Sequence, residues 1–248
     1  MAGAGVVGTG SGETLGGVMV TVEAVTVRER IITPHGELEL RQRSLAKDVQ
    51  WEITQDGYFV CPTKRSHSAI ELIQYGLNAL PKESRELKVL IGGLGLGFSL
   101  QAALAHPGVA QVDVVEWEKV IIGWNLRFFG RHSKEALMDP RTRLIAGNLL
   151  DVLPTMESRY HLIALDIDNG PGGLVHSEKA AGSDDGGFLS VIREHLLPGG
   201  ALTVWSDKYQ EEFLTWLKFV FSQAAVRRVW DKEDDGGPLE AFIYRAIL

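Results

Sequence analysis

The segment Lys88-Val-Leu-Ile-Gly-Gly-Leu-Gly-Leu-Gly-Phe98 decides the fold of this chain. Its apolar first half predicts a buried strand, and the stretch 98–105 that follows it predicts a helix. Between them lies a glycine turn, formed by Gly93, Gly95 and Gly97. Glycine at such a turn lets the backbone come close to a ligand, so the segment predicts the loop of a nucleotide-type binding site.

An acidic residue closes the second strand of the same unit. The apolar run 111–115 ends in Glu116, about twenty residues beyond the glycine turn, which is the spacing of a strand–helix–strand nucleoside site. A carboxylate there can accept hydrogen bonds from both ribose hydroxyls. The alternatives are a tight turn without a ligand and an acid that caps the next helix. Glu118 is assigned to the first turn of that helix, where acids are favoured.

From residue 88 onward, strand and helix patterns alternate, which is typical of a mostly parallel sheet with helices on both faces. Predicted strands lie at 87–91, 111–115, 142–146, 160–165 and 200–205. Predicted helices lie at 98–106, 117–128, 186–196 and 208–222. A turn-rich segment separates two last strands, 225–230 and 239–246, and predicts a hairpin. The expected fold class is α/β, a Rossmann-like mostly parallel seven-stranded sheet with an antiparallel C-terminal edge hairpin.

The region before this sheet has a different pattern. Residues 1–17 are rich in glycine and predict a disordered tail. Residues 18–65 contain short runs of alternating apolar and polar side chains separated by turns, which predict a small antiparallel β element. Residues 66–248 are assigned to the Rossmann-like domain, whose first helix, 66–80, has apolar residues at helical spacing.

Composition and charge narrow the classes of partner. The net charge of −7 disfavours a general nucleic-acid binder, which needs a basic face to neutralise phosphates. The single cysteine, Cys61, excludes an internal disulfide, argues against a cysteine zinc site and fits a reducing compartment. No apolar run approaches the roughly 18 residues that span a bilayer, and a signal peptide is not expected. We therefore expect a cytoplasmic protein without a membrane segment or a metal site.

A second group of polar residues follows the apolar strand 160–165. Asp166 stands at the tip of that strand, and Asp168 and Asn169 come directly after it. Because parallel strands deliver catalytic groups at their carboxyl ends, Asp166 is predicted to orient an attacking amine or hydroxyl, or to take its proton. Asp168 and Asn169 are candidate substrate contacts. The alternative is that these acids cap a loop, and the glycine-rich segment 172–187 is either a lid or a linker.

Two further residues are candidates for the same site. Asn148 follows the strand 142–146 and can meet an adenine edge, or cap a helix. His67 stands at the start of the helix 66–80 and is either a substrate contact or a surface histidine.

Together these residues resemble the spermidine synthase (polyamine aminopropyltransferase) family, within the class I S-adenosylmethionine-dependent methyltransferase superfamily. The matching segments are Asp56-Gly57 with Cys61 and Glu71, Lys88-Val-Leu-Ile-Gly-Gly93, Val112-Asp-Val-Val-Glu116, Asp139-Pro-Arg141, Gly147, and Tyr160 to Asp166. The resemblance implies a homodimeric transferase whose donor is S-adenosylmethionine or its decarboxylated form. It implies a donor site formed by Gly93, Gly95, Leu96, Gly97, Glu116, Asn148 and Asp166. Asp166 matches the catalytic base of the family.

The chain departs from the family pattern at positions that bind ammonium groups. Leu96 stands where the glycine loop of the family has an Asp that contacts the donor amine, and Asn169 replaces an acid that contacts the polyamine. Smaller departures are Ala69-Ile70 for a Tyr-Gln pair and Asn148 for an adenine-contacting Asp. A charge-assisted hydrogen bond contributes roughly 1.5–3 kcal/mol. Losing two of them is expected to weaken recognition of the usual donor and acceptor by about a hundredfold or more.

Three hypotheses follow. The leading one is a transferase with an S-adenosylmethionine-type donor. Methyl transfer to a small-molecule acceptor is slightly favoured because the amine-binding Asp is missing, and aminopropyl transfer to a polyamine is the alternative. A nicotinamide-dependent oxidoreductase would use the same glycine turn and acid, but the terminal hairpin and the Asp166 segment argue against it. The third hypothesis is a non-catalytic binding or dimerisation module.

Overall fold

The structure is a computed structural model of the 248-residue chain, and it describes residues 24–45, 48–62, 66–166, 187–232 and 237–248. The chain divides into two compact units between Lys64 and Arg65. Some predicted features lie outside the described residues: the tail 1–17, Asp168, Asn169 and all but the last residue of the segment 172–187.

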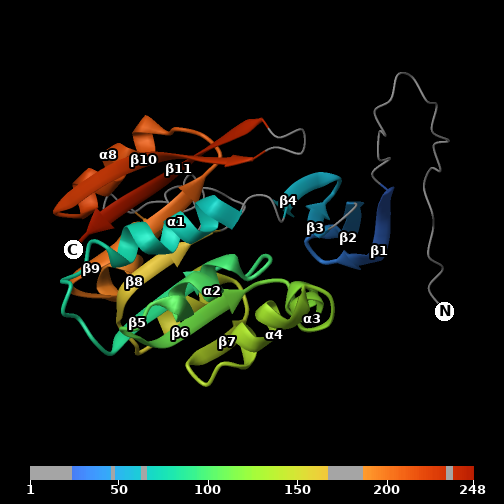
Figure 1. Cartoon of the computed structure of the whole chain (residues 1–248). Helices are drawn as coiled ribbons and strands as arrows, with labels where there is room; N and C mark the ends of the chain where they lie inside the picture. Colours follow the sequence, from blue (N-terminus) through green and yellow to red (C-terminus); the bar gives the residue numbers. More distant parts are fainter. Residues whose placement is uncertain (1–23, 46–47, 63–65, 167–186, 233–236) are drawn as a thin grey trace. The chain divides into compact units, whose positions relative to one another are not determined.

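The first unit is a four-stranded antiparallel sheet in the order β1-β2-β3-β4, blue in Figure 1. Its strands are β1 (Ala24–Thr33), β2 (Gly36–Leu45), β3 (Asp48–Gln55) and β4 (Tyr58–Pro62). Leu38, Leu40 and Ile53 are buried. The Asp56 carboxylate accepts a hydrogen bond from the Glu37 N–H at 2.8 Å, which ties the β3–β4 turn to β2. The predicted small N-terminal β element is confirmed.

The second unit is built on a seven-stranded sheet in the order β10-β11-β9-β8-β5-β6-β7. Its strands are β5 (Leu87–Gly92), β6 (Val109–Glu116), β7 (Thr142–Ala146), β8 (Tyr160–Leu165), β9 (Leu196–Ser206), β10 (Gln223–Lys232) and β11 (Pro238–Ile247). Strands β5 to β9 pair in parallel, whereas β11 is antiparallel to both of its neighbours. The predicted mostly parallel sheet with a terminal hairpin is confirmed.

The terminal hairpin lies at one edge of the sheet, with β10 outermost and β11 between β10 and β9 (orange to red in Figure 1). The antiparallel strand is therefore the inner strand of the hairpin, not the edge strand. Side chains explain this order, because β11 buries Ile243 and Tyr244 completely, as an inner strand requires. β10 instead exposes Arg227 and Arg228, and charged side chains are typical of edge strands.

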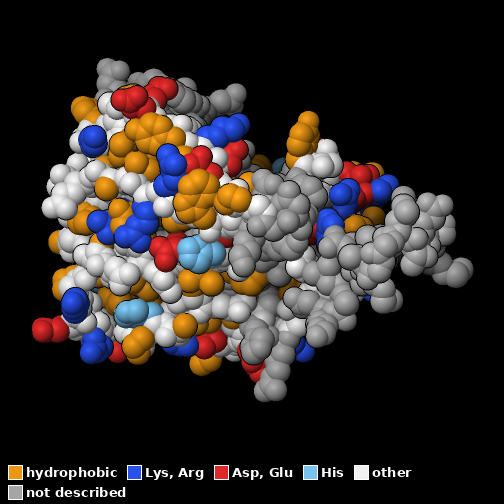
Figure 2. Space-filling model, turned by 45° about the horizontal axis from the view of Figure 1, so that its top comes forward, with side chains coloured by type: hydrophobic (Ala, Val, Ile, Leu, Met, Phe, Trp, Pro, Cys, Tyr) orange, Lys and Arg blue, Asp and Glu red, His pale blue; other side chains and the backbone are white. Residues whose placement is uncertain are grey.

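The charges of this edge are paired. Arg227 forms an ion pair with Glu71 of the first helix at 3.0 Å, and Arg228 forms one with Glu240 at 2.9 Å. Figure 2 shows basic and acidic side chains interspersed in the same way over the face that it presents.

Helices cover both faces of this sheet. They are α1 (Ser66–Leu77), α2 (Phe98–Ala105), α3 (Lys119–Arg127), α4 (Gly130–Met138), α5 (Leu149–Val152), α7 (Phe188–Glu194) and α8 (Glu211–Val220), with the short 3-10 helix η2 (Leu153–Thr155). Gly76 of α1 lies against Leu162 of β8. Buried residues of α7 and α8 pack in a cluster with the next residue, Ile163. Because successive residues of a strand point to opposite faces, α1 lies on one face and α7 and α8 on the other.

Several details of the predicted helices are wrong. Helices α4 and α5 were not expected, and α3 begins at Lys119 instead of residue 117. Glu118 is not in the first turn of α3 but at its N-cap position, with an extended backbone. The cause is local, because the Glu118 N–H donates to the Glu116 carboxylate at 2.8 Å and this bond holds the chain in a turn before the helix.

A buried polar network joins three strands of the sheet. The carboxylate of Asp113 on β6 is completely buried and accepts hydrogen bonds from Tyr160 (2.7 Å), Gln111 (2.8 Å) and the guanidinium of Arg143 (3.1 Å from Nε). A buried carboxylate is tolerated only where such donors replace water. The network therefore belongs to the framework that carries the tip of β6.

We expect the Asp113→Ala substitution to lower the free energy of unfolding by about 3 kcal/mol, because it leaves the Tyr160 hydroxyl buried without its acceptor and removes the carboxylate that pairs with the half-exposed Arg143 guanidinium. Urea unfolding followed by circular dichroism measures this change. The Tyr160→Phe control removes one donor of several and should cost only about 1 kcal/mol. Equal stability of Asp113→Ala and the unchanged protein would show that the network does not stabilise the fold.

The same network predicts a loss of stability in alkali. Burial, together with the neighbouring Asp113 carboxylate, raises the pKa of Tyr160 far above its ordinary value. Below about pH 10 the hydroxyl is protonated in both states, whereas above it only the unfolded chain ionises, so stability falls with rising pH. We expect the free energy of unfolding to fall by up to about 1.4 kcal/mol per pH unit above pH 10, and less steeply in Tyr160→Phe. Identical slopes for the two proteins would contradict this assignment.

Candidate functional site

Three segments meet at the carboxyl ends of the neighbouring strands β5, β6 and β8. The Gly93 N–H donates to the Val115 carbonyl on β6 at 2.9 Å. On the other side of β5, the Asp166 N–H donates to the Gly92 carbonyl at 2.8 Å. The chain passes from β5 toward β6 and β7 in one direction and toward β8 and β9 in the other. Ligands of such sheets bind at this change of direction, so the predicted site residues Glu116 and Asp166 flank the expected position.

The glycine turn between β5 and α2 adopts the conformation that the sequence predicts. Gly93, Gly95 and Gly97 have φ angles of 93°, 49° and 82°, in the left-handed region that glycine adopts at no steric cost. At Gly97 a side chain would also meet its surroundings, since an added Cβ would lie 3.2 Å from the Asn125 side chain. Gly97 is therefore favoured by its backbone angle, and a side chain there would also require the Asn125 amide to shift by a few tenths of an ångström.

Glu116 is held at the tip of β6 by backbone donors. Its side chain is buried, with 6% of the residue exposed. One carboxylate oxygen accepts from the Leu94 N–H in the glycine turn, and the other from the Glu118 N–H, both at 2.8 Å. These bonds fix the carboxylate beside the turn, which is the arrangement expected for an acid that binds a ribose.

The glycine turn carries two leucines, and both are buried. Leu94 and Leu96 are each 4% exposed. Leu96 occupies the position where the spermidine synthase pattern has an Asp. The turn therefore contributes no side-chain charge, and its polar groups are those of the backbone.

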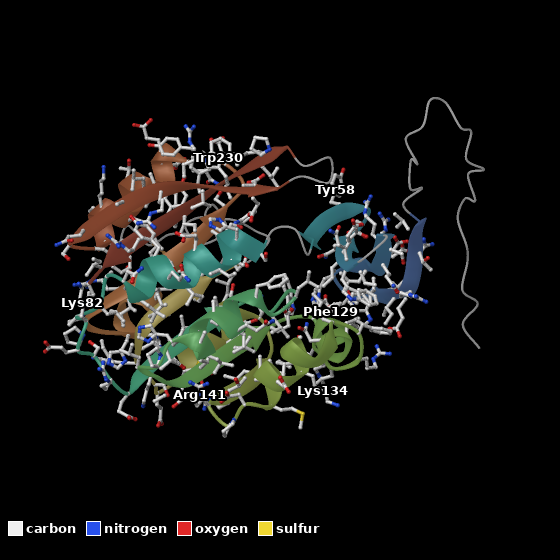
Figure 3. All side chains as sticks on the ribbon, viewed as in Figure 1. Tyr58, Lys82, Phe129, Lys134, Arg141 and Trp230 are labelled. Carbon is white, nitrogen blue, oxygen red and sulfur yellow. The ribbon has the colours of Figure 1, made fainter. Side chains whose placement is uncertain are left out.

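Asn125 and Ser133 were not predicted from the sequence. Asn125 on α3 is completely buried, and its amide donates to the Gly95 carbonyl at 2.8 Å and to the Ile121 carbonyl at 2.9 Å. The Ser133 hydroxyl on α4 donates to the Asn125 carbonyl oxygen. The labels Phe129 and Lys134 locate this region in Figure 3. Phe129 directly precedes α4, and Lys134 follows Ser133 on that helix. The sequence offered one signal for Asn125, an amide side chain among the apolar residues of a helix. It did not indicate the partner, because Gly95 lies thirty positions earlier in the chain.

Asp166 directly follows β8, and its side chain is half-buried. Its backbone bond to Gly92 places it next to the start of the glycine turn. The predicted acceptor contacts Asp168 and Asn169 come after it in the part of the chain that the structure does not describe.

Asn148 caps α5. Its side-chain oxygen accepts from the Leu150 N–H at 2.9 Å, as the alternative interpretation of this residue anticipated. The Gly147 N–H donates to the Glu116 carbonyl at 2.9 Å, so Asn148 lies close to the tip of β6. A contact between Asn148 and adenine stays a prediction, and its amide nitrogen is the group that would make it.

His67 is exposed in the first turn of α1. That turn is anchored by hydrogen bonds to other elements, among them the bond from the Trp205 indole to the Ser68 hydroxyl at 3.1 Å. The Ser99 hydroxyl on α2 donates to the Ala69 carbonyl at 3.3 Å, and the Ser68 N–H donates to the Asp231 carboxylate at 3.0 Å. Because Ser99 follows Gly97 by two positions, His67 stands on a turn that contacts the helix after the glycine loop. Its role in binding substrate stays a prediction.

Within the described ranges, no group of three or more His, Cys, Asp and Glu side chains is arranged to hold a metal ion. None of the described helices has the length and apolar character that crossing a membrane requires.

Comparison with known proteins relates this chain to two kinds of transferase. It is 30% identical over 117 residues to polyamine aminopropyltransferase 1 of Pseudomonas aeruginosa, which covers 46% of this chain and 38% of the relative. It is 25% identical over 136 residues to putrescine N-methyltransferase 2 of Nicotiana attenuata, which covers 55% of this chain and 34% of that relative. No protein-family model matches the chain. The matched part spans little more than a third of the length of these relatives.

The fold is that of spermidine synthase. The crystal structure of spermidine synthase from Thermotoga maritima matches 89% of this chain, and 72% of its own, with a TM-score of 0.69 at 16% sequence identity. The same values are found for a spermidine synthase in complex with the transition state analogue AdoDATO. The resemblance predicted from the sequence is therefore confirmed.

Proposed function

We propose that this protein is a transferase that binds a sulfonium nucleoside, S-adenosylmethionine or its decarboxylated form, and transfers a group from it to a small-molecule acceptor. The observation that carries the proposal is the buried Glu116 carboxylate, hydrogen-bonded to the Leu94 N–H of the glycine turn. A ribose bound by Glu116 directs its 5′ substituent over the turn, where the glycines let the backbone approach it. Asn148, close to the tip of β6, is assigned to the adenine.

Methyl transfer is the favoured reaction. The acid that would bind the donor amine is replaced by the buried Leu96, and a putrescine N-methyltransferase is among the relatives. Aminopropyl transfer from decarboxylated S-adenosylmethionine to a polyamine is the second candidate. Polyamine aminopropyltransferases are 29–30% identical to the chain, which is similar to the 25% identity of the putrescine N-methyltransferase.

In either reaction the protein positions reactants around an electrophile that the donor supplies. The lone pair of the acceptor attacks the carbon next to sulfur, the carbon–sulfur bond breaks, and its electron pair stays on sulfur as a neutral thioether. The new bond makes the acceptor nitrogen cationic, and a proton must leave it. Asp166, next to the glycine turn, is the base that we assign to this proton, and holding the reactants in line supplies most of the acceleration.

The acceptor contacts that we propose are His67, Asp168 and Asn169. A homodimer and a cytoplasmic location are also proposals, and both rest on the resemblance and on the sequence.

Calorimetric titration tests the donor site. We expect the full chain to bind S-adenosylmethionine, decarboxylated S-adenosylmethionine and methylthioadenosine. In a parallel titration, we expect no binding of NADH. Failure to bind any of the three sulfur nucleosides would overturn the proposal, and binding of NADH alone would favour an oxidoreductase.

Product analysis separates the two reactions. With putrescine as acceptor, methyl transfer releases S-adenosylhomocysteine, whereas aminopropyl transfer releases methylthioadenosine. A protein that binds the donors but forms neither product with any amine or alcohol would be the non-catalytic module.

A further inference from the structure

The buried amide of Asn125 fixes the direction of one peptide group in the glycine turn. Both N–H bonds of the amide are used, one on the Gly95 carbonyl (2.8 Å) and one on the Ile121 carbonyl (2.9 Å). Its oxygen accepts from Ser133, which is 2% exposed. A buried side chain whose polar groups are all satisfied has a single favourable orientation. The Gly95 carbonyl is therefore held toward α3.

The planarity of this peptide group also fixes the direction of its N–H bond. In a trans peptide the N–H points away from the carbonyl, so the Leu96 N–H points away from α3. Two N–H groups of the turn are occupied, since Leu94 donates to the Glu116 carboxylate and Gly97 donates to the Leu94 carbonyl. Neither the Gly95 N–H nor the Leu96 N–H makes a hydrogen bond to any described residue, but only the Leu96 N–H belongs to the peptide group whose carbonyl Asn125 holds. Asn125 thus keeps a backbone donor, instead of a backbone acceptor, on the side away from α3.

We propose that Asn125 is a positioning residue that sets the choice of donor: it holds the Gly95–Leu96 peptide so that the Leu96 N–H donates to a carboxylate on the 5′ substituent of the bound nucleoside. This inference rests on the proposed function, which places that substituent over the glycine turn. An N–H donor favours a substituent that ends in a carboxylate, such as that of S-adenosylmethionine. A substituent that ends only in an ammonium group finds neither the Asp of the family pattern nor a carbonyl at this peptide.

Three nucleosides separate this role from a merely structural one. S-adenosylmethionine carries the carboxylate, decarboxylated S-adenosylmethionine lacks it, and methylthioadenosine lacks the whole amino-acid part. In Asn125→Asp, an oxygen replaces the donor that faces the Gly95 carbonyl, and in Asn125→Ser the side chain is too short to reach it. We expect either variant to raise the Kd of S-adenosylmethionine roughly tenfold, because a hydrogen bond to a charged group is lost. The Kd of the other two nucleosides should change by less than about threefold.

Ser133→Ala is the matched control, because it removes a bond to the same side chain but keeps both Asn125 donors. It should leave the Kd ratio of the two S-adenosylmethionine forms unchanged. Thermal unfolding followed by circular dichroism identifies a variant that fails to fold, and the second Asn125 variant then carries the test.

The outcomes are distinguishable. If the Asn125 variants weaken all three nucleosides equally, or none of them, the role of Asn125 in donor choice is overturned while the donor site stands. If the unchanged protein binds none of the three, the proposed function fails and this inference fails with it.

Discussion

Replacing Glu116 by Gln is expected to raise the Kd of methylthioadenosine by about a hundredfold or more. The carboxylate would make two charge-assisted hydrogen bonds to the ribose hydroxyls, each contributing roughly 1.5–3 kcal/mol. The amide has one oxygen in place of two, so it also fails to satisfy the N–H groups of Leu94 and Glu118 together. Isothermal titration calorimetry measures the change, and circular dichroism establishes that the variant is folded.

Glu118→Gln is the control for this substitution. It alters an acid two positions away but keeps the backbone N–H that donates to Glu116, so methylthioadenosine should bind with nearly unchanged Kd. If Glu116→Gln does not fold, Glu116→Asp supplies a second test, because the shorter carboxylate keeps its charge but not its reach. A folded Glu116 variant with the Kd of the unchanged protein would remove the main support for a nucleoside site at β6.

Replacing Asp166 by Asn is expected to lower kcat by a factor of about 10²–10⁴, the usual contribution of a general base. The substitution keeps the size of the side chain and the backbone bond to the Gly92 carbonyl. It removes the charge that takes the acceptor proton, so the Kd of methylthioadenosine should stay within about threefold of its original value. Steady-state kinetics with the best acceptor found by product analysis measures the effect.

Asp207→Asn is the control for general effects of a lost carboxylate, because Asp207 is exposed beyond the end of β9 and pairs with its neighbour Lys208. Turnover by Asp166→Asn within tenfold of the original rate would reject Asp166 as the base. In that case the proton would leave to solvent.

The sequence predicted the strand–turn–strand unit that carries the proposed donor site because the determinants of that unit are local. The strand before Gly93, the glycine turn and the strand that ends in Glu116 lie within about thirty residues, the length of one strand–helix–strand unit. Such a unit depends on turn chemistry and apolar periodicity, both of which can be read along the chain.

Features that depend on distant partners could not be predicted in this way. Asn125 owes its importance to Gly95, thirty positions earlier. Which hairpin strand lies inside the sheet and which lies at its edge depends on which of the two is covered on both faces. That covering comes from other elements of the assembled sheet, so it cannot be read from the hairpin sequence alone. Helix α4 was missed for another reason, since Gly130-Arg-His-Ser-Lys-Glu-Ala-Leu-Met138 is short and largely polar. Its stability comes from packing on its neighbours more than from its own sequence.

The position of β11 also determines the order in which the sheet can be completed. β9 and β10 precede β11 along the chain, yet neither can pair with the other, because β11 lies between them. Five strands can therefore assemble as the chain leaves the ribosome, while β10 must wait, without a partner in the sheet, for a strand synthesised after it. We expect β10 to join the sheet only after β11 has paired with β9, and until then the unpaired edge of β9 is the part of the sheet that needs protection from aggregation.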